Sequence, residues 1–183
     1  MIVPSTRVFT AGEIETGAYL NSAITNLGNF NLGKPVTLLR QTSAQSPNFT
    51  ASTYTALNWS VADVNRDNNF ATGSPTLWTC NTAGWYRFAG ETSFSAVASA
   101  VSDRRTAWYK TPSGGSAAVV SYGVNIDRLS VTNAVTTLNA SSIMIYMAVG
   151  DAMELRAYTA GTGYTTYTVS GFQPWMSAEW VSL

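Results

Sequence analysis

Hydrophobic and polar residues alternate in short runs over most of the chain, and turn residues separate the runs. Successive side chains of a β-strand point to opposite faces of its sheet, so this period of two is typical of half-buried strands. The breaks are rich in glycine, proline, asparagine and aspartate, which favour tight turns. Strands are therefore predicted at Val36–Arg40, Tyr54–Trp59, Thr76–Cys80, Trp85–Ala96, Arg104–Thr111, Ala117–Asn125, Val135–Asn139, Ser142–Val149, Met153–Thr159, Tyr164–Val169 and Ser177–Leu183. This pattern indicates an all-β sandwich or barrel.

The predicted strand Trp85–Ala96 shows the alternation most clearly. Tyr86 and Phe88 fall on one face, whereas Arg87 and Glu91 fall on the other. A strand with one aromatic face and one polar face is typical of a sheet that packs on a core on one side only. We therefore expect the aromatic residues of this strand to lie in the core.

The predicted strand Ser142–Val149 is apolar on both faces. Ile143, Ile145, Met147 and Val149 share one face, and Met144, Tyr146 and Ala148 share the other. An antiparallel strand with two apolar faces requires cover on both. A second sheet supplies one cover, and either the N-terminal segment or a neighbouring subunit supplies the other. We favour the neighbouring subunit, with Met144 and Tyr146 in the contact, because little chain remains to cover a whole sheet.

A single segment near the N-terminus has a helical pattern. Leu20, Ile24 and Leu27 recur at helical spacing. Thr10 with Glu13, or Thr16, could cap the start, and the stop signals are Gly28, Gly33 and Pro35. A helix of about three turns with one narrow apolar stripe is marginal alone in water. It must dock on its own domain, on sister chains or on a larger assembly. We divide the chain into an arm, residues 1–35, and a head domain, residues 36–183.

Composition narrows the classes of partner. Charged residues make up 11% of the 183 residues, against a usual share of about 25%, and the net charge is zero. A nucleic-acid-binding protein needs a basic surface, so this class is not expected. The longest apolar run, Ile143–Val149, is far shorter than a membrane-spanning helix, and we expect no membrane partner. The single cysteine, Cys80, is expected to be a small buried thiol.

The absence of histidine removes several catalytic arrangements at once. Neither a Ser-His-Asp triad nor a His-ligated zinc ion can form. A glycosidase needs only two carboxylates, so a polysaccharide-degrading enzyme stays a remote alternative. However, Glu91, Glu154 and Glu179 are placed on the polar faces of predicted strands. We therefore predict no catalytic residues and no cofactor.

A polar segment offers the one recognisable metal motif. Asp63, Asn65 and Asp67 match the first three ligand positions of a calcium loop, D-x-N-x-D. The match then fails, because Asn68 stands where the loop requires glycine and Ser74 stands where it requires glutamate. We expect a polar loop whose side chains bond its own backbone, and keep bound calcium as the alternative.

The order of motifs from Leu57 to Leu183 resembles the C1q/TNF-like jelly-roll family. The matching features are Trp59, "DVNRDNN" at Asp63–Asn69, "NTAGWYRFAGETSF" at Asn81–Phe94, "DRRTAWYK" at Asp103–Lys110, "MAVGDAMELRAY" at Met147–Tyr158 and the final "SAEWVSL". The resemblance covers about two-thirds of the chain. It implies a two-sheet antiparallel jelly-roll sandwich that assembles as a homotrimer through aromatic and apolar faces.

The N-terminal segment "FTAGEIETGAYLNSAITNLGNF" is similar to attachment segments of tailed-bacteriophage structural proteins. The similarity rests on Gly12, Glu13, Thr16, Leu20 and Asn21. It implies a protein made in the host cytoplasm and built into the virion, with other virion proteins as partners. Leu20, Ile24 and Leu27 are then the expected docking stripe on the particle.

Three functions from different classes are compatible with these patterns. The first is a noncatalytic virion structural protein, such as a capsid decoration, a head fibre or a minor tail protein. The second is a receptor-binding tail-tip or fibre head that recognises a host surface glycan. The third is the polysaccharide-degrading enzyme. The sequence favours the first, and it does not distinguish capsid from tail.

Overall fold

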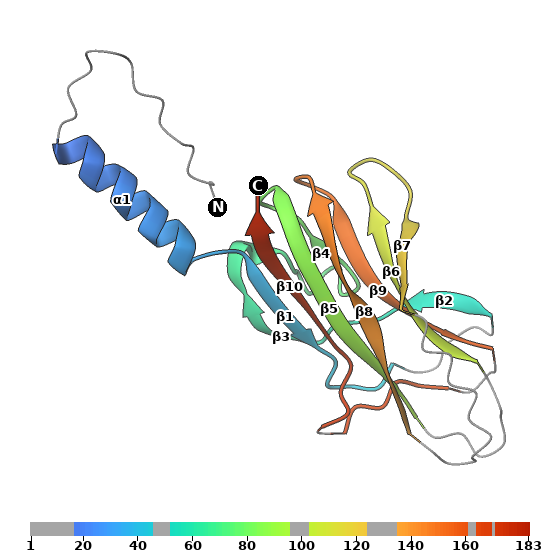
Figure 1. Cartoon of the computed structure of the whole chain (residues 1–183). Helices are drawn as coiled ribbons and strands as arrows, with labels where there is room; N and C mark the ends of the chain where they lie inside the picture. Colours follow the sequence, from blue (N-terminus) through green and yellow to red (C-terminus); the bar gives the residue numbers. More distant parts are fainter. Residues whose placement is uncertain (1–16, 46–51, 96–102, 124–134, 161–163, 170) are drawn as a thin grey trace.

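The computed structural model describes residues 17–45, 52–95, 103–123, 135–160, 164–169 and 171–183. Two antiparallel sheets face each other as a sandwich, and one α-helix precedes them (Figure 1). The predicted all-β, two-sheet jelly roll with a short N-terminal helix is confirmed.

Sheet A contains the longest strand of the fold and holds the first and last strands side by side. Its order is β3 (Val61–Asn65), β1 (Val36–Arg40), β10 (Trp175–Ser182), β5 (Gly84–Phe94) and β8 (Thr136–Met147). The neighbours β1 and β10 come from opposite ends of the domain. Residues far apart in sequence therefore share the outer face of this sheet.

Sheet B is the opposite layer of the sandwich. Its order is β2 (Thr53–Ala56), β9 (Ala152–Thr159), β6 (Arg104–Thr111) and β7 (Ala118–Gly123). The short strand β4 (Trp78–Thr79) also pairs with β9, at the end away from β2. Strand β9 is thus central and carries pairing partners on both edges.

Aromatic side chains from both sheets fill the space between the layers. The ring of Trp78 lies 4.9 Å from that of Tyr86 and 5.1 Å from that of Phe88, both edge to face. Trp108 of sheet B packs on Phe88 at 5.7 Å. The indole N–H of Trp78 donates to the Thr37 hydroxyl at 3.0 Å, so this buried polar group is satisfied. The predicted core position of Tyr86 and Phe88 is confirmed.

Strand β8 is one continuous strand, where the sequence predicted two. The predicted break around Ala140 is a shift in register against β5, between the pairs Phe88↔Ile143 and Gly90↔Ala140. An extra residue in one strand produces a β-bulge, which bends the strand without ending it. The small and polar residues at this point therefore mark a bulge inside one strand and not a break between two strands.

Two other predictions differ from the structure. The polar segment Val61–Asn65 was not predicted as a strand, but forms the edge strand β3 beside β1. An edge strand with an exposed face has little of the apolar alternation by which strands are found. Conversely, Tyr164–Val169 is no strand. It lies along the end of β5 through the hydrogen bonds Ser95 N–H to Thr165 C=O and Tyr167 N–H to Ser93 C=O, at 2.8 and 2.9 Å.

Helix α1 spans Gly17–Leu32 and projects away from the sandwich (Figure 1). It continues through Gly28, which was predicted as a stop, and ends at Leu32, just before the predicted stop Gly33, whose N–H donates to the Asn29 carbonyl at 2.9 Å. A glycine inside a helix weakens it but does not break it. The expected capping residues Thr10, Glu13 and Thr16 lie outside the described residues. In the part of the chain that the structure describes, no helix combines the length and apolar character needed to cross a membrane.

Candidate subunit interface

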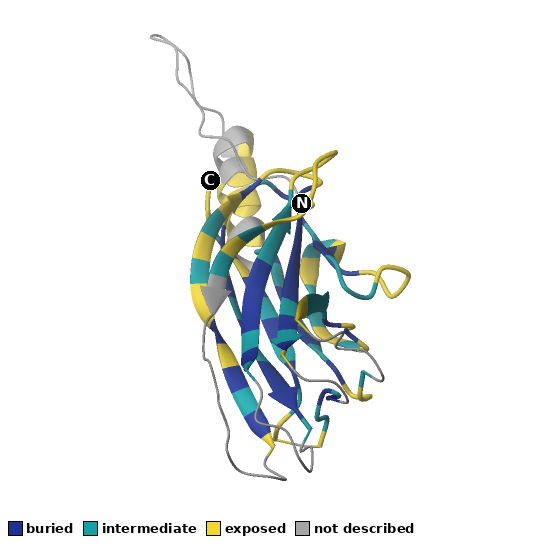
Figure 2. Ribbon diagram, turned by 90° about the vertical axis from the view of Figure 1, so that its right-hand side faces the viewer, coloured by how far each residue is buried: buried dark blue, intermediate teal, exposed yellow. Residues whose placement is uncertain are grey.

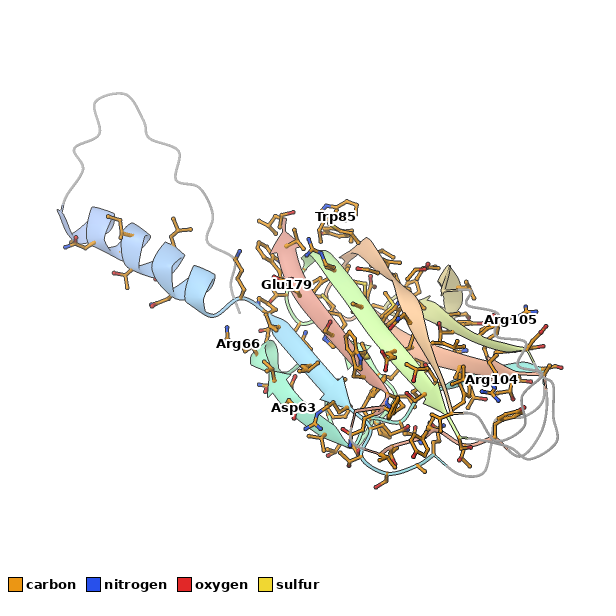
Figure 3. The ribbon with its side chains drawn as sticks, turned by 60° about the horizontal axis from the view of Figure 1, so that its bottom comes forward. Asp63, Arg66, Trp85, Arg104, Arg105 and Glu179 are labelled. Carbon is orange, nitrogen blue, oxygen red and sulfur yellow. The ribbon has the colours of Figure 1, made fainter. Side chains whose placement is uncertain are left out.

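The outer face of sheet A carries an exposed apolar patch, formed by Trp85, Met144 and Tyr146. The exposed fractions of these residues are 41%, 61% and 43%. They face outward because their neighbours Tyr86 and Met147 point into the core, and side chains alternate along a strand. Trp85 and Tyr146 are paired across β5 and β8, and their rings meet edge to face at 5.9 Å. Figure 3 shows Trp85 at the end of β5.

The charged residues beside the patch pair with each other. Arg87 lies between Glu179 of β10 and Met144 of β8 in the strand register. The guanidinium of Arg87 is 4.0 Å from the Glu179 carboxylate, and both side chains are exposed. An exposed pair at this distance contributes little to stability. The charges beside the patch therefore cancel, and in the part of the chain that the structure describes the three side chains of the patch stay largely exposed.

The other end of the same face is polar. Arg40 of β1 forms a two-pronged ion pair with Asp63 of β3, and one Arg40 N–H donates to the Gln173 side chain at 2.9 Å. The hydrogen bond from Arg40 lowers the pKa of the Asp63 carboxyl. Trp175 is half-buried here and pairs in register with Glu91. Burial raises the pKa of Glu91, and a side-chain hydrogen bond with Trp175 opposes the rise.

The outer face of sheet B also carries aromatic residues, but they form a closed stack. Tyr54, from β2, lies 5.1 Å from the ring of Tyr158 and 5.8 Å from the ring of Tyr109. The guanidinium of Arg105 lies 5.0 Å from the Tyr158 ring, and that of Arg156 lies 4.0 Å from the Tyr109 ring. Each end of the tyrosine stack is thus covered by a cation held over a ring face.

Both arginines of this stack have a carboxylate partner. Arg156 donates to Glu154 at 2.5 Å, and Arg105 is 3.2 Å from Asp103. Glu154 is buried, although it lies on the outer face of its strand, because this layer of side chains covers it. Sheet B therefore covers its own outer aromatic residues, and its charges are balanced within the layer.

A buried carboxylate ties the two sheets together at one end of the sandwich. Asp151, in the turn after β8, is 2.7 Å from the ammonium of Lys110 and accepts the N–H groups of Ser113 and Ala148 at 3.0 Å each. Lys110 also donates to the Tyr146 carbonyl at 2.8 Å. Burial alone would raise the pKa of Asp151, but these hydrogen bonds outweigh burial and lower the pKa.

The three residues of the calcium motif each bind a different protein group. Asp63 pairs with Arg40, whereas Asn65 exchanges two hydrogen bonds with the backbone of Phe70, at 2.9 and 3.2 Å. Asp67, which lies in a short 3-10 turn with a positive φ of 70°, accepts the Thr82 hydroxyl at 2.7 Å. The motif is thus divided between strand β3 and the turn after it, and the side chain of each of its three residues is engaged by another protein group.

The remaining reactive groups are buried. Burial raises the pKa of the Cys80 thiol to about 11, which keeps it protonated and unreactive at neutral pH. Arg104 is enclosed between the sheets, where it donates to the Thr136 hydroxyl and lies 4.7 Å from the Tyr164 ring. Among the described residues, no group of three acids or cysteines is placed to hold a metal ion.

The residues of the predicted docking stripe lie on α1. Ile24 and Leu27 are 62% and 54% exposed. Leu20 lies on the same helix, but its side chain is outside the described part of the structure. Figure 2 shows α1 behind the upper part of the sandwich, with its described residues exposed.

Sequence reasoning placed Met144 and Tyr146 on the outer face but missed Trp85 as their neighbour. It assigned the aromatic residues of this strand to the core. The alternation itself puts Trp85 on the face of Arg87, opposite Tyr86 and Phe88. That signal was present in the sequence, but the pairing of β5 with β8 was needed to bring Trp85 and Tyr146 together.

Comparisons with known proteins identify the fold. No protein-family model matches the chain, and no curated protein is similar in sequence. The structure is similar to the globular domain of zebrafish complement 1qA protein, with a TM-score of 0.54 and 11% identity over 81% of this chain and 97% of that chain. It is also similar to murine APRIL at pH 5.0, with a TM-score of 0.57 and 10% identity over 80% of this chain and 98% of that one. Likeness at this identity shows the fold alone, and it confirms the predicted C1q/TNF-like jelly roll.

Proposed function

We propose that this C1q/TNF-like jelly roll is a noncatalytic structural protein of a tailed-bacteriophage particle. It assembles as a homotrimer, and the arm of residues 1–35 attaches it to the virion. The particle role draws its support from the resemblance of "FTAGEIETGAYLNSAITNLGNF" to phage attachment segments. Within the particle, the protein is a capsid decoration, a head fibre or a minor tail protein.

The main observation in support of the proposed trimer is the exposed patch of Trp85, Met144 and Tyr146. A soluble protein rarely leaves a tryptophan, a tyrosine and a methionine exposed together, and such patches mark contacts with other proteins. Aromatic residues and methionine are also the types enriched at subunit contacts. Arg87 and Glu179 beside the patch carry opposite charges, so the margin of the patch has no net charge that would oppose a contact between copies.

A noncatalytic role agrees with the state of the reactive side chains. The chain has no histidine, and its cysteine is a buried thiol with a raised pKa. The acids Asp151 and Glu154 are engaged with Lys110 and Arg156. These groups serve to hold the fold and leave no exposed pair of acids among them for glycoside cleavage.

The outer face of sheet B favours a second candidate, a receptor-binding head. If sheet A closes the trimer, sheet B faces outward, and its tyrosine and arginine side chains are residue types that dominate binding surfaces. Purified protein that adsorbs to host cells or host glycans, and that blocks infection, would support this role. A structural protein should do neither.

Two measurements test the proposal. Sedimentation of the full chain at micromolar concentration should give a single species with three times the chain mass of 19.6 kDa. A stable monomer would contradict the trimer. Electron microscopy of intact particles should find the protein at a fixed copy number on the shell or the tail, and its absence from purified particles would overturn the virion role.

A further inference from the structure

Helix α1 lies outside the sandwich, and its described side chains are exposed. Besides Ile24 and Leu27, the exposed positions are Ala18, Asn21, Ser22, Thr25, Asn26, Gly28 and Asn29. An isolated helix of 16 residues is marginal in water, and an internal glycine weakens it by about 1 kcal/mol. The helix therefore requires a second surface over its apolar stripe.

The composition of α1 favours copies of itself as that surface. Residues 17–32, "GAYLNSAITNLGNFNL", contain no lysine, arginine, aspartate or glutamate. Identical parallel helices bring identical side chains face to face, so any charge near the contact would repel its own copy. The spacing Leu20, Ile24, Leu27 alternates four and three residues, which is the a and d spacing of a helical bundle.

The attachment of α1 to the head also favours this arrangement. Only residues 33–35 separate the end of the helix from β1 of sheet A. Pro35 is buried, and its carbonyl accepts the backbone N–H of Trp180 at 3.0 Å, while the Lys34 ammonium lies 5.8 Å from the centroid of the Trp180 ring. The C-terminal end of the helix is thus held at a fixed point next to β1, in the same sheet that carries the exposed patch. Copies joined through sheet A would hold their helices at high effective concentration, which offsets the short length of each helix.

We propose that α1 packs against the α1 helices of its sister copies through Ile24 and Leu27, with Leu20 in the same stripe. The result is a short parallel bundle that forms the stem of the head. This inference rests on the proposed trimer. It places the stripe inside the stem, so attachment to the particle falls to the outer surface of the bundle and to residues 1–16.

Disulfide trapping in the full chain tests this contact. Leu27→Cys places a thiol inside the bundle, and Ser22→Cys places one on the opposite, exposed face of the helix. Cys80 is buried and stays reduced in both variants. Under mild oxidation of dilute protein, Leu27→Cys should form linked dimers at least ten times faster than Ser22→Cys. Equal rates in a trimeric protein would overturn the stem and leave the trimer intact.

Charge substitution gives an independent measurement by hydrogen exchange. Ile24→Asp would place a carboxylate from every copy at the centre of the stem, so exchange of the amides of residues 17–32 should rise at least tenfold. Ser22→Asp should leave their exchange unchanged, and both variants should keep the sedimentation mass of the wild type. Rapid exchange in the wild-type trimer that slows only on binding to particles would mean that a virion protein covers the stripe, and would overturn the proposal. A monomeric wild type would contradict the proposed trimer itself.

Discussion

The outer faces of the two sheets differ in whether other side chains cover their aromatic residues. On sheet B, Tyr54, Tyr109 and Tyr158 stack on one another, and two arginines cover the ends of the stack. On sheet A, the rings of Trp85 and Tyr146 meet edge to face, and no arginine covers them among the described contacts. Both faces are rich in aromatic side chains, so aromatic content alone does not distinguish the proposed subunit contact from the outer face of sheet B. The two faces differ in whether other side chains cover the aromatic rings.

The difference arises from where each arginine finds its carboxylate. Arg156 pairs with Glu154, two residues away on the same strand and face, and this keeps its guanidinium over the neighbouring Tyr109 ring. Arg87 pairs with Glu179 of β10, whereas Met144 lies on the opposite side of β5. A guanidinium can cover an aromatic ring and bind a carboxylate together, but only when both lie on the same side of it.

The largest expected effect comes from a charge in the uncovered patch. Met144→Asp would place a carboxylate from each copy in the proposed contact, and burying an unpaired charge costs several kcal/mol. We expect dissociation constants to rise at least a hundredfold, so the variant sediments as a monomer at micromolar concentration. Val120→Asp, at an exposed apolar residue of β7 on sheet B, is the matched control and should stay trimeric. Trimeric Met144→Asp would contradict the assignment of the patch.

Removing the arginine that covers Tyr109 on sheet B should lower the free energy of unfolding without changing the oligomeric state. Arg156→Ala leaves the buried Glu154 carboxylate without its partner and exposes the Tyr109 ring. The free energy of unfolding should fall by about 3 kcal/mol. Urea unfolding in the monomeric Met144→Asp background measures this without a concentration-dependent term. A loss below about 1 kcal/mol would show that the stack is not a cohesive layer.

The contribution of the Asp151–Lys110 ion pair to the free energy of unfolding should depend on pH. Asp151→Asn removes the charge that binds Lys110, and we expect a loss of about 2 kcal/mol in the free energy of unfolding at pH 7. The pKa of Asp151 is lowered in the folded protein, so its contribution is complete above the unfolded pKa near 3.8 and is lost as the pH falls toward the folded value. The difference between wild type and variant should therefore shrink below about pH 4. An unchanged difference at pH 3 would contradict a charge-based role.

The smallest effect is expected for the exposed pair on sheet A. Arg87→Ala breaks a contact of 4.0 Å between two exposed side chains. The free energy of unfolding, measured in the same monomeric background, should change by less than about 0.5 kcal/mol. A loss equal to that of Arg156→Ala would remove the distinction between the two faces.

Much of the fold could be predicted from local pattern, and the failures share one cause. The alternation around Tyr86 and Phe88 located β5, because a strand with one buried face needs apolar residues at every second position. The edge strand β3 was missed because it buries little, and the bulge at Ala140 was taken for a break between two strands because both interrupt the alternation. The local pattern of hydrophobic and polar residues indicates which side chains are buried. Strand β3 and the bulge in β8 depend instead on pairing with strands that are distant in the sequence.

Local pattern also identified part of the candidate subunit interface, but not the contacts that depend on distant strands. Met144 and Tyr146 were identified because a strand that is apolar on both faces needs two covers. The calcium motif was found from the spacing of Asp63, Asn65 and Asp67 alone. In the structure, Asp63 pairs with Arg40 and Asp67 accepts a hydrogen bond from Thr82, and both partners are distant in the chain. The residues of the stack on sheet B come from β2, β6 and β9, and no local signal joins them.

The all-β class, the aromatic core and the low charge of the surface can be read from the amino-acid sequence, since they follow from composition and from the period of two along each strand. Which aromatic residues are covered depends instead on how the strands pair. Cover depends on strand order and register, which place Arg156 over Tyr109 but leave Trp85, Met144 and Tyr146 together and exposed. Register is a relation between segments far apart in the chain, so no single segment contains it.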